Sequence, residues 1–247
     1  MSGHSHFSSI KHKKAFEDEK RGRIFSKFAR MISVTVKDGT DPTFNSKLRQ
    51  VLDEAKNFNM PKDKIERAIK RGTGEIEGNK LEEIIYEAFG PGGIAIIIEC
   101  ITDNRNRTLS EIKHILQKYN GKLAESGSVK WLFERKGIIT LQISDEETSL
   151  NKDKTSIELI AIESGAEDID YNAEENILDI YTKTEELEEI KERLINKKIE
   201  IDSSCLGWVA KNKVNVEKKE KSSCEKIFEE MDEEEDVQNI YSNLKID

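Results

Sequence analysis

The chain has 247 residues and a mass of 28.3 kDa, with 40 Lys and Arg against 49 Asp and Glu, so its formal charge is −9. Charged and apolar residues each make up 36% of it, against roughly 25% and 45–50% in average globular domains, which argues against one large core. The longest apolar run, Ile94 to Ile98, is far shorter than the ~18 residues that span a bilayer. The composition therefore excludes a transmembrane helix.

The first residues and the cysteines indicate the compartment. Met1 to Phe7 lack the apolar segment of a secretory signal and the arginine-rich pattern of a transit peptide, so we expect a cytoplasmic protein. The three cysteines are widely spaced and form no C-x-x-C, which predicts neither a disulfide framework nor a zinc site.

Charge is distributed unevenly along the chain. Residues 1–79 hold 17 Lys and Arg against 11 Asp and Glu, whereas the remaining 168 residues hold 23 against 38. Such asymmetry between the two parts of a chain is typical of nucleic-acid binding or of an acidic tail. Three of the four histidines, His4, His6 and His12, also lie at the basic end.

Residues 1–79 are predicted to form a basic arm and a three-helix bundle. Residues 1 to about 15 are polar and basic, with too little apolar surface to offset the entropy of ordering, and we interpret them as an arm. Apolar residues at helical spacing predict a helix from Phe16 to Val36, ended by Asp38-Gly39. A second helix, capped by Asn45, and a third, begun by Pro61 and stopped by Gly72, follow.

Beyond Lys80 the apolar period alternates between 2 and 3.6 residues, which predicts an α+β fold of two lobes. The expected helices are 108–119, 155–164, 185–196 and 220–231. The expected strands are 84–89, 93–101, 128–133, 137–143, 167–171, 177–182, 199–202, 209–216 and 237–241. Split β-α-β units of this kind are typical of ferredoxin-like lobes.

Basic residues of the arm and of two helix faces are the candidate nucleic-acid contacts. On the first helix, Lys20, Arg23, Lys27, Arg30 and Lys37 fall in one arc, and Arg21 lies on the apolar side. Arm and helix together would neutralise about six phosphates; the alternative is an ordinary solvated face. The full predicted set is Lys11, His12, Lys13, Lys14, Lys20, Arg21, Arg23, Lys27, Arg30, Lys64, Arg67, Lys70, Arg71, Arg105 and Arg107.

Three further features carry open alternatives. Phe7, an isolated aromatic among basic residues, suits stacking on a base, or it docks onto the protein itself. Arg105 and Arg107, between a strand and a helix, suit either phosphate contacts or salt bridges. The acidic run from Glu229 to Asp236 is interpreted as a solvated helix end, or else as a phosphate mimic that meets the basic arm.

The sequence offers no catalytic or metal constellation. It contains no G-x-S-x-G, no H-E-x-x-H, and no cysteine with an evident histidine partner. The three N-terminal histidines lack further ligands to close a metal site, and residues 90–93 (Gly-Pro-Gly-Gly) lack the lysine and spacing of a phosphate loop. We therefore expect a protein without enzymatic activity, cofactor, metal or small-molecule substrate.

Ordered motifs along the whole chain resemble the YebC/PmpR family, which includes the mitochondrial translational activator of cytochrome c oxidase subunit I. The resemblance lies in Gly3-His4-Ser5, in residues 10–15 (IKHKKA), 21–25 (RGRIF), 59–63 (NMPKD) and 65–72 (IERAIKRG), and in later blocks. These are Tyr86-Glu87, 90–93 (GPGG), 102–108 (TDNRNRT), 127–129 (GSV) and 236–239 (DVQN). The chain departs from the family at His6-Phe7, where Lys-Trp is usual, and at Ala210, where Pro is usual.

The resemblance implies three domains, the third inserted in the second. They correspond to residues 1–79 (basic arm and helical domain), 80–135 plus 206–247 (middle α+β domain) and 136–205 (inserted α+β domain). Family members are described as DNA-binding transcriptional regulators of the cytoplasm, or as ribosome-associated factors that assist translation through proline-rich stretches.

Three hypotheses follow from the sequence. The first is a monomeric DNA-binding transcriptional regulator, and the second is a translation factor whose basic region contacts ribosomal RNA on the ribosome. The third is a protein-interaction scaffold that uses the acidic lobes.

Overall fold

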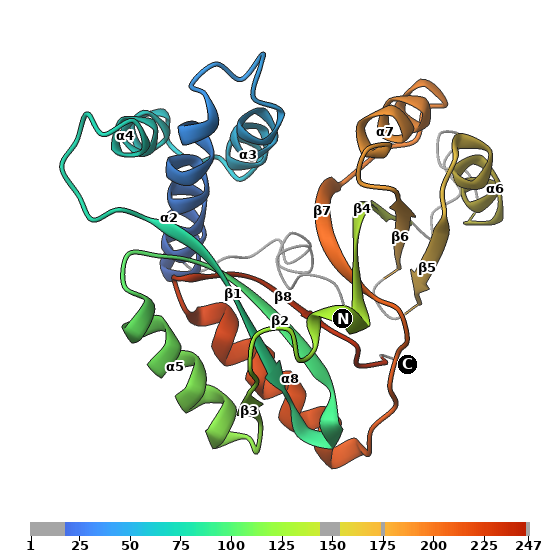
Figure 1. The fold of residues 1–247 in the computed structure, drawn as a ribbon. Helices are drawn as coiled ribbons and strands as arrows, with labels where there is room; N and C mark the ends of the chain where they lie inside the picture. The colour runs from blue at the N-terminus through green and yellow to red at the C-terminus, as the bar shows by residue number, and fades with distance from the viewer. Residues whose placement is uncertain (1–17, 144–153, 174–175, 246–247) are drawn as a thin grey trace.

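The computed structural model describes residues 18–143, 154–173 and 176–245. Figure 1 shows three regions: a helical region formed by α2, α3 and α4, a first lobe built on β1, β2, β3 and β8, and a second lobe built on β4, β5, β6 and β7. The helix α2 runs from the other two helices towards the first sheet, to which it brings the basic region. The expected α+β class, with a helical N-terminal region and two lobes, is confirmed.

The helical region contains α2 (Asp18–Thr35), a short 3-10 turn (Val36–Asp38), α3 (Ser46–Asn57) and α4 (Lys62–Gly72). Its core holds the residues that the helical spacing selected, among them Phe28, Ile32 and Leu48. The predicted cap is confirmed, because the side chain of Asn45 accepts a hydrogen bond from the backbone N–H of Leu48 at 3.0 Å.

Close backbone contact joins α4 to α2. The hydroxyl of Ser33 donates to the carbonyl oxygen of Ala68 at 2.8 Å. A Cβ at Gly72 would lie 2.2 Å from Cγ1 of Val36 and 2.4 Å from the carbonyl oxygen of Ser33. Only glycine permits this approach without a shift of α4, and the approach fixes which face of α4 remains in solvent.

The first lobe is an antiparallel sheet with strand order β3-β1-β2-β8. Its strands are β1 (Glu82–Phe89), β2 (Ala95–Thr102), β3 (Lys122–Leu123) and β8 (Val237–Ser242). Two helices, α5 (Arg105–Lys118) and α8 (Lys218–Glu233), pack on one face and form the largest core with β1, β2 and β8. After β3 the chain leaves the first lobe, forms the second lobe, and returns to the first lobe at α8 (Figure 1).

The second lobe is also an antiparallel sheet of four strands, with the order β5-β6-β4-β7. Along the chain it runs β4 (Phe133–Gln142), α6 (Lys154–Ser164), β5 (Asp168–Asn172), β6 (Ile177–Thr182), α7 (Leu187–Asn196) and β7 (Ser203–Ala210). This β-α-β-β-α-β sequence is the ferredoxin-like arrangement that the alternating periods predicted. In the first lobe, by contrast, the chain starts with the two central strands.

Two predicted strands are wrong, for identifiable physical reasons. Residues 128–133 form no strand before Phe133, because the carboxylate of Glu87, which is 5% exposed, accepts the N–H groups of Gly127, Val129 and Lys130 at 2.6, 2.7 and 2.9 Å. Residues 199–202 are also outside the sheet. The N–H of Ile199 closes the end of α7 by donating to the carbonyl of Leu194 at 3.0 Å, and its side chain joins the core.

A third strand prediction was misplaced, and the domain limits remain a prediction. Where a strand was expected over 209–216, β7 ends at Ala210. The strands β4 and β7 pair without interruption from Phe133 with Ala210 to Thr140 with Ser203. The predicted limits at 135/136 and 205/206 therefore lie inside these two strands.

Replacement of Gly72 tests the contact between α2 and α4. We expect Gly72→Ala to lower the free energy of unfolding by about 1–3 kcal/mol, because the new methyl group meets the backbone of Ser33. Gly22→Ala in α2 is the matched control, since a methyl group at that position would have nothing within 4 Å of it, and alanine favours a helix by about 1 kcal/mol. Urea denaturation of both variants measures the difference, and equal stability of the two would contradict this account of the contact.

Candidate nucleic-acid interface

The cationic face of α2 lies against the acidic end of α8 rather than in solvent. Arg23 pairs with Glu233 at 3.3 Å. The ammonium group of Lys27, whose side chain is 3% exposed, lies 2.9 Å from the Asp232 carboxylate and donates to the Asp232 carbonyl oxygen at 2.7 Å. A charge that is buried to this degree is maintained only when it is paired and hydrogen-bonded.

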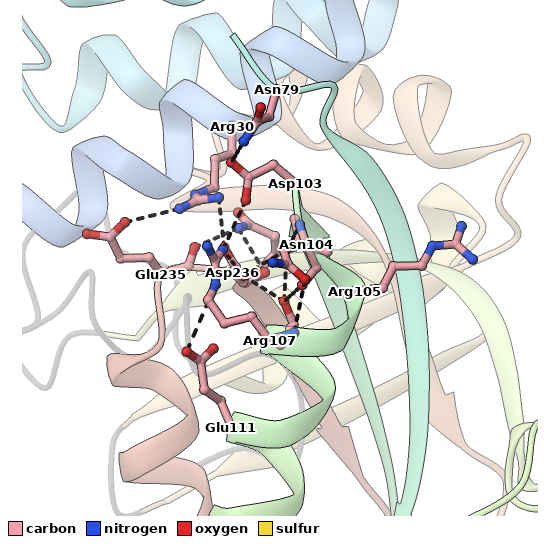
Figure 2. A network of polar contacts seen from close by, with 12 residues as sticks. Arg30, Asn79, Asp103, Asn104, Arg105, Arg107, Glu111, Glu235 and Asp236 are labelled. Carbon is pink, nitrogen blue, oxygen red and sulfur yellow. Dashed lines mark hydrogen bonds and ion pairs between the residues drawn. The ribbon is translucent and has the colours of Figure 1, made fainter.

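Asp236 is the centre of the same contact (Figure 2). Its carboxylate lies 2.7 Å from Arg30 on one oxygen and accepts from Arg107, Thr108 and Thr102 at 2.7, 2.6 and 2.8 Å on the other. Burial by itself would raise the pKa of Asp236, but these hydrogen bonds and the charge of Arg30 outweigh it and hold the pKa below the ordinary value. Arg30 also reaches Glu235 at 3.1 Å.

These contacts bear on two predictions. Arg23, Lys27 and Arg30 hold the helical region on the first lobe, so the fold gives these predicted phosphate contacts carboxylate partners inside the protein. The acidic run is not simply a solvated helix end, because Asp232, Glu233, Glu235 and Asp236 all pair with α2. The interpretation as a phosphate mimic was nearer to the structure, although it named the arm and not α2 as the partner.

Arg105 and Arg107 serve the first lobe. Arg105 extends away from the Asp236 cluster (Figure 2) and forms a two-pronged pair with the Glu82 carboxylate at 2.5 and 2.7 Å. That hydrogen-bonded pair raises the pKa of Arg105 and lowers the pKa of Glu82. Arg107 joins α5 to β8 through Asp236. Of the two alternatives at this loop, the geometry favours salt bridges.

On α4 the predicted cations remain exposed. Lys64, Arg67, Lys70 and Arg71 fall in one arc away from Ile65. Lys64 lies over the ring of Phe25, 5.1 Å from its centroid. Within the described part of the chain, Arg67, Lys70 and Arg71 take part in none of the ion pairs. This is the cationic face that the fold leaves available to a partner.

Other predicted contacts lie at the start of the chain. Arg21 is exposed near the beginning of α2. Lys20 belongs to α2, but its side chain is not described. Phe7 and the arm residues Lys11, His12, Lys13 and Lys14 lie outside the described residues.

The sequence reasoning missed the loop before α3. Phe44, just ahead of the Asn45 cap, is the most exposed large apolar side chain among the described residues, at 91%. Lys47 and Arg49 follow in the first turns of α3, and both are exposed. The spacing of Phe44 gives no signal of exposure, because Phe44 precedes Leu48 by four residues, as Leu48 precedes Leu52, and would continue the buried stripe of α3. Only its position ahead of the Asn45 cap places Phe44 outside the helix.

The three regions meet at a cavity of about 480 Å³. Among its lining residues, Glu99 accepts hydrogen bonds from Arg135 at 2.7 Å, from Trp208 at 2.9 Å, and from Asn239 and Tyr241 at 3.1 and 3.2 Å. The lining carries both signs of charge, including Lys47, Glu54 and Glu83. This mixture does not match a polyanion.

Two other kinds of site are absent from the described residues. No helix among them has the length and apolar composition to cross a membrane. Nor does that part of the chain bring together three or more metal-ligating side chains.

Comparisons with known proteins agree with this architecture. Residues 5–75 match the family described as the TACO1/YebC protein N-terminal domain, and residues 81–244 match the TACO1/YebC second and third domain. A "Probable transcriptional regulatory protein" from Halothermothrix orenii is 46% identical, over 100% of this chain and 96% of that protein. One of the same name from Natranaerobius thermophilus is 44% identical, over 100% of this chain and 97% of its own length.

A solved structure shares the whole fold. The crystal structure of a conserved hypothetical protein from Aquifex aeolicus superposes with a TM-score of 0.85 at 40% identity, and the match covers 96% of each chain. Fold and surface thus define an α+β protein with a basic helical region held on two acidic lobes. The chain belongs to the TACO1/YebC family.

Removal of the Asp236 charge tests the contact between α2, α5 and β8. We expect Asp236→Asn to lower the free energy of unfolding by about 2–3 kcal/mol, because Arg30 and Arg107 then face a neutral amide in a largely buried site. The control, Asp53→Asn, removes an exposed pair with Lys56 and should cost less than about 1 kcal/mol. Chemical denaturation compares the two, and a small loss at Asp236 would show that the pairs do not stabilise the fold.

The lowered pKa of Asp236 predicts an acid dependence of stability. The stabilisation is fully present above the unfolded value of 3.8 and is lost as the pH falls through the lower pKa of the folded state. We expect the difference in unfolding free energy between wild type and Asp236→Asn to be constant above about pH 5 and to shrink below 3.8. Denaturation curves over this range measure the difference, and a constant difference at all pH values would contradict the assignment.

Proposed function

We propose that this protein is a regulator of gene expression that binds DNA through its helical region, without catalysis. Support comes from the names of its relatives, "probable transcriptional regulatory protein", and from the distribution of charge. The single observation that carries the proposal is the exposed face of Arg67, Lys70 and Arg71 on α4, which is unpaired within the described residues. The fold leaves this face in solvent while it pairs the cations of α2.

The electrostatics favour a polyanion on one side of the molecule. Residues 1–79 carry an excess of Lys and Arg, and the rest of the chain carries an excess of Asp and Glu. A phosphate backbone is therefore attracted to the helical region and repelled by the lobes. We propose that the protein orients itself on DNA with α4 inward and the acidic lobes outward.

The arm extends this interface in the proposal. Lys11, Lys13 and Lys14, with His12, precede α2 by a few residues. The three lysines together with Arg67, Lys70 and Arg71 supply about six phosphate contacts without Arg23, Lys27 and Arg30. Contacts of this kind position a protein on a duplex and carry no base specificity. In this proposal the protein acts in the cytoplasm as a monomer, and it uses neither a cofactor nor a small-molecule substrate.

The test is the salt dependence of duplex DNA binding. For wild type we expect the logarithm of the binding constant to fall with the logarithm of salt concentration with a slope of about −5. Replacement of Arg67, Lys70 and Arg71 by Gln should reduce the steepness of that slope by about 2.7, or 0.9 per lost contact. Fluorescence anisotropy from about 50 to about 300 mM salt measures the slopes.

The matched control replaces Lys113, Lys211 and Lys226 by Gln. These lysines are exposed and lie outside the helical region, and the change in net charge is the same. Its slope should equal that of wild type. An α4 variant with an unchanged slope would reject the α4 interface, and tighter binding to a structured RNA than to duplex DNA would reject DNA as the target.

A further inference from the structure

Phe44 is a large aromatic side chain that the fold leaves in solvent. Its ring is 91% exposed, whereas Phe25 and Phe28 of the same region are in the core. A residue just before a helix cap often packs against the fourth residue of the helix. Here that residue is Arg49, and the exposure of Phe44 shows that no such packing covers the ring.

The loop that carries Phe44 is held tightly. The buried amide of Asn45 donates to the carbonyl oxygens of Thr35 and Gly39 at 2.9 and 2.8 Å, in addition to capping α3. The N–H of Thr43 donates to the Asp41 carboxylate at 2.8 Å, and the N–H groups of Phe44 and Asn45 donate to the Asp41 carbonyl oxygen at 3.1 and 3.0 Å. The ring is thus presented from a fixed backbone, which lowers the entropy cost of binding through it.

The charges around the ring suit nucleic acid. Arg49 is exposed and takes part in none of the ion pairs between described residues, whereas Lys47 lines the cavity where the three regions meet. The nearest acid in sequence, Asp41, is engaged by the Thr43 N–H, and hydrogen bonds from Thr43 lower its pKa. An exposed aromatic ring with an unpaired cation close to it in the chain is a combination suited to stacking on a base while the cation meets an adjoining phosphate.

We propose that Phe44 stacks on a nucleobase of the bound nucleic acid, with Arg49 on a flanking phosphate. The proposal rests on the proposed function. It adds a contact with a base to the phosphate contacts of α4. The π-face of a base becomes accessible in two ways, by partial unstacking of a duplex step or in a single strand. The test distinguishes these two sources.

The experiment uses 2-aminopurine, whose fluorescence changes when its stacking changes, placed at each position in turn of a duplex and of the corresponding single strand. With wild type we expect a fluorescence change at a defined position. Phe44→Ala should abolish that change and weaken binding about 5- to 150-fold, the range for loss of one aromatic stack. A change in the duplex alone indicates an unstacked step, and a change in the single strand alone indicates an unpaired base.

Two sets of variants separate stacking from other effects. Phe44→Trp should restore both signals and Phe44→Leu should not, because leucine keeps apolar bulk without a π-face. Trp131→Ala is the matched control, since Trp131 is a 65% exposed aromatic on a loop of the first lobe, outside the helical region. It should leave binding unchanged.

The salt slope separates this proposal from the proposed function. Phe44→Ala should shift the binding constant at every salt concentration and leave the slope as in wild type, because no phosphate contact is lost. If wild type binds with the expected slope but Phe44→Ala binds equally well, only the stacking proposal is overturned. If wild type shows no salt-dependent binding to duplex or single strand, both proposals fail.

Discussion

The ion pairs between α2 and the acidic residues Asp232 to Asp236, at the end of α8 and just after it, are the contact on which the arrangement of the molecule depends. Lys27 and Arg30 are taken out of solvent against Asp232 and Asp236, and such pairs stabilise a fold only when the geometry satisfies nearly every donor and acceptor. Arg107, Thr102 and Thr108 complete this set around Asp236. One carboxylate thereby joins the helical region, α5 and β8. The orientation of α4 and of the loop before α3 relative to the lobes follows from this junction.

This constraint also explains the division of charge in the helical region. The cations of α2 neutralise carboxylates of the same chain, so their part of the basic excess is used inside the protein. The helix α4 contacts Ser33 and Val36 through Ala68 and Gly72. Because that face of α4 is covered, its cations lie on the opposite face, in solvent. The helical region thus has two sets of cations: those of α2 pair with the first lobe, and those of α4 are exposed to a partner. The count of Lys and Arg does not distinguish these two uses.

Stability and binding act on separate residues in this arrangement. Asp236 and Gly72 hold elements together through burial and close backbone contact. Arg67, Lys70, Arg71 and Phe44 are exposed and take no part in the core. Substitutions at the proposed interface should therefore leave the fold intact. The cavity where the three regions meet is lined by Glu99 and its hydrogen-bond partners, and its lining carries both signs of charge, whereas the exposed face of α4 carries cations.

The sequence by itself determined the elements whose signals are local. Periodicity located α2, α3, α4 and most strands, the Asn45 cap was readable from its residue type, and the ordered motifs indicated the family. It failed where a distant group decided the outcome: Glu87 draws residues 127–130 out of a strand, and the carboxylates of α8 occupy the cations of α2. Burial and pairing depend on which residues meet in space, and contacts such as Lys27 with Asp232, which lie 205 residues apart, leave no periodic trace. Only the tertiary structure therefore decided which cations are free and that Phe44 faces solvent.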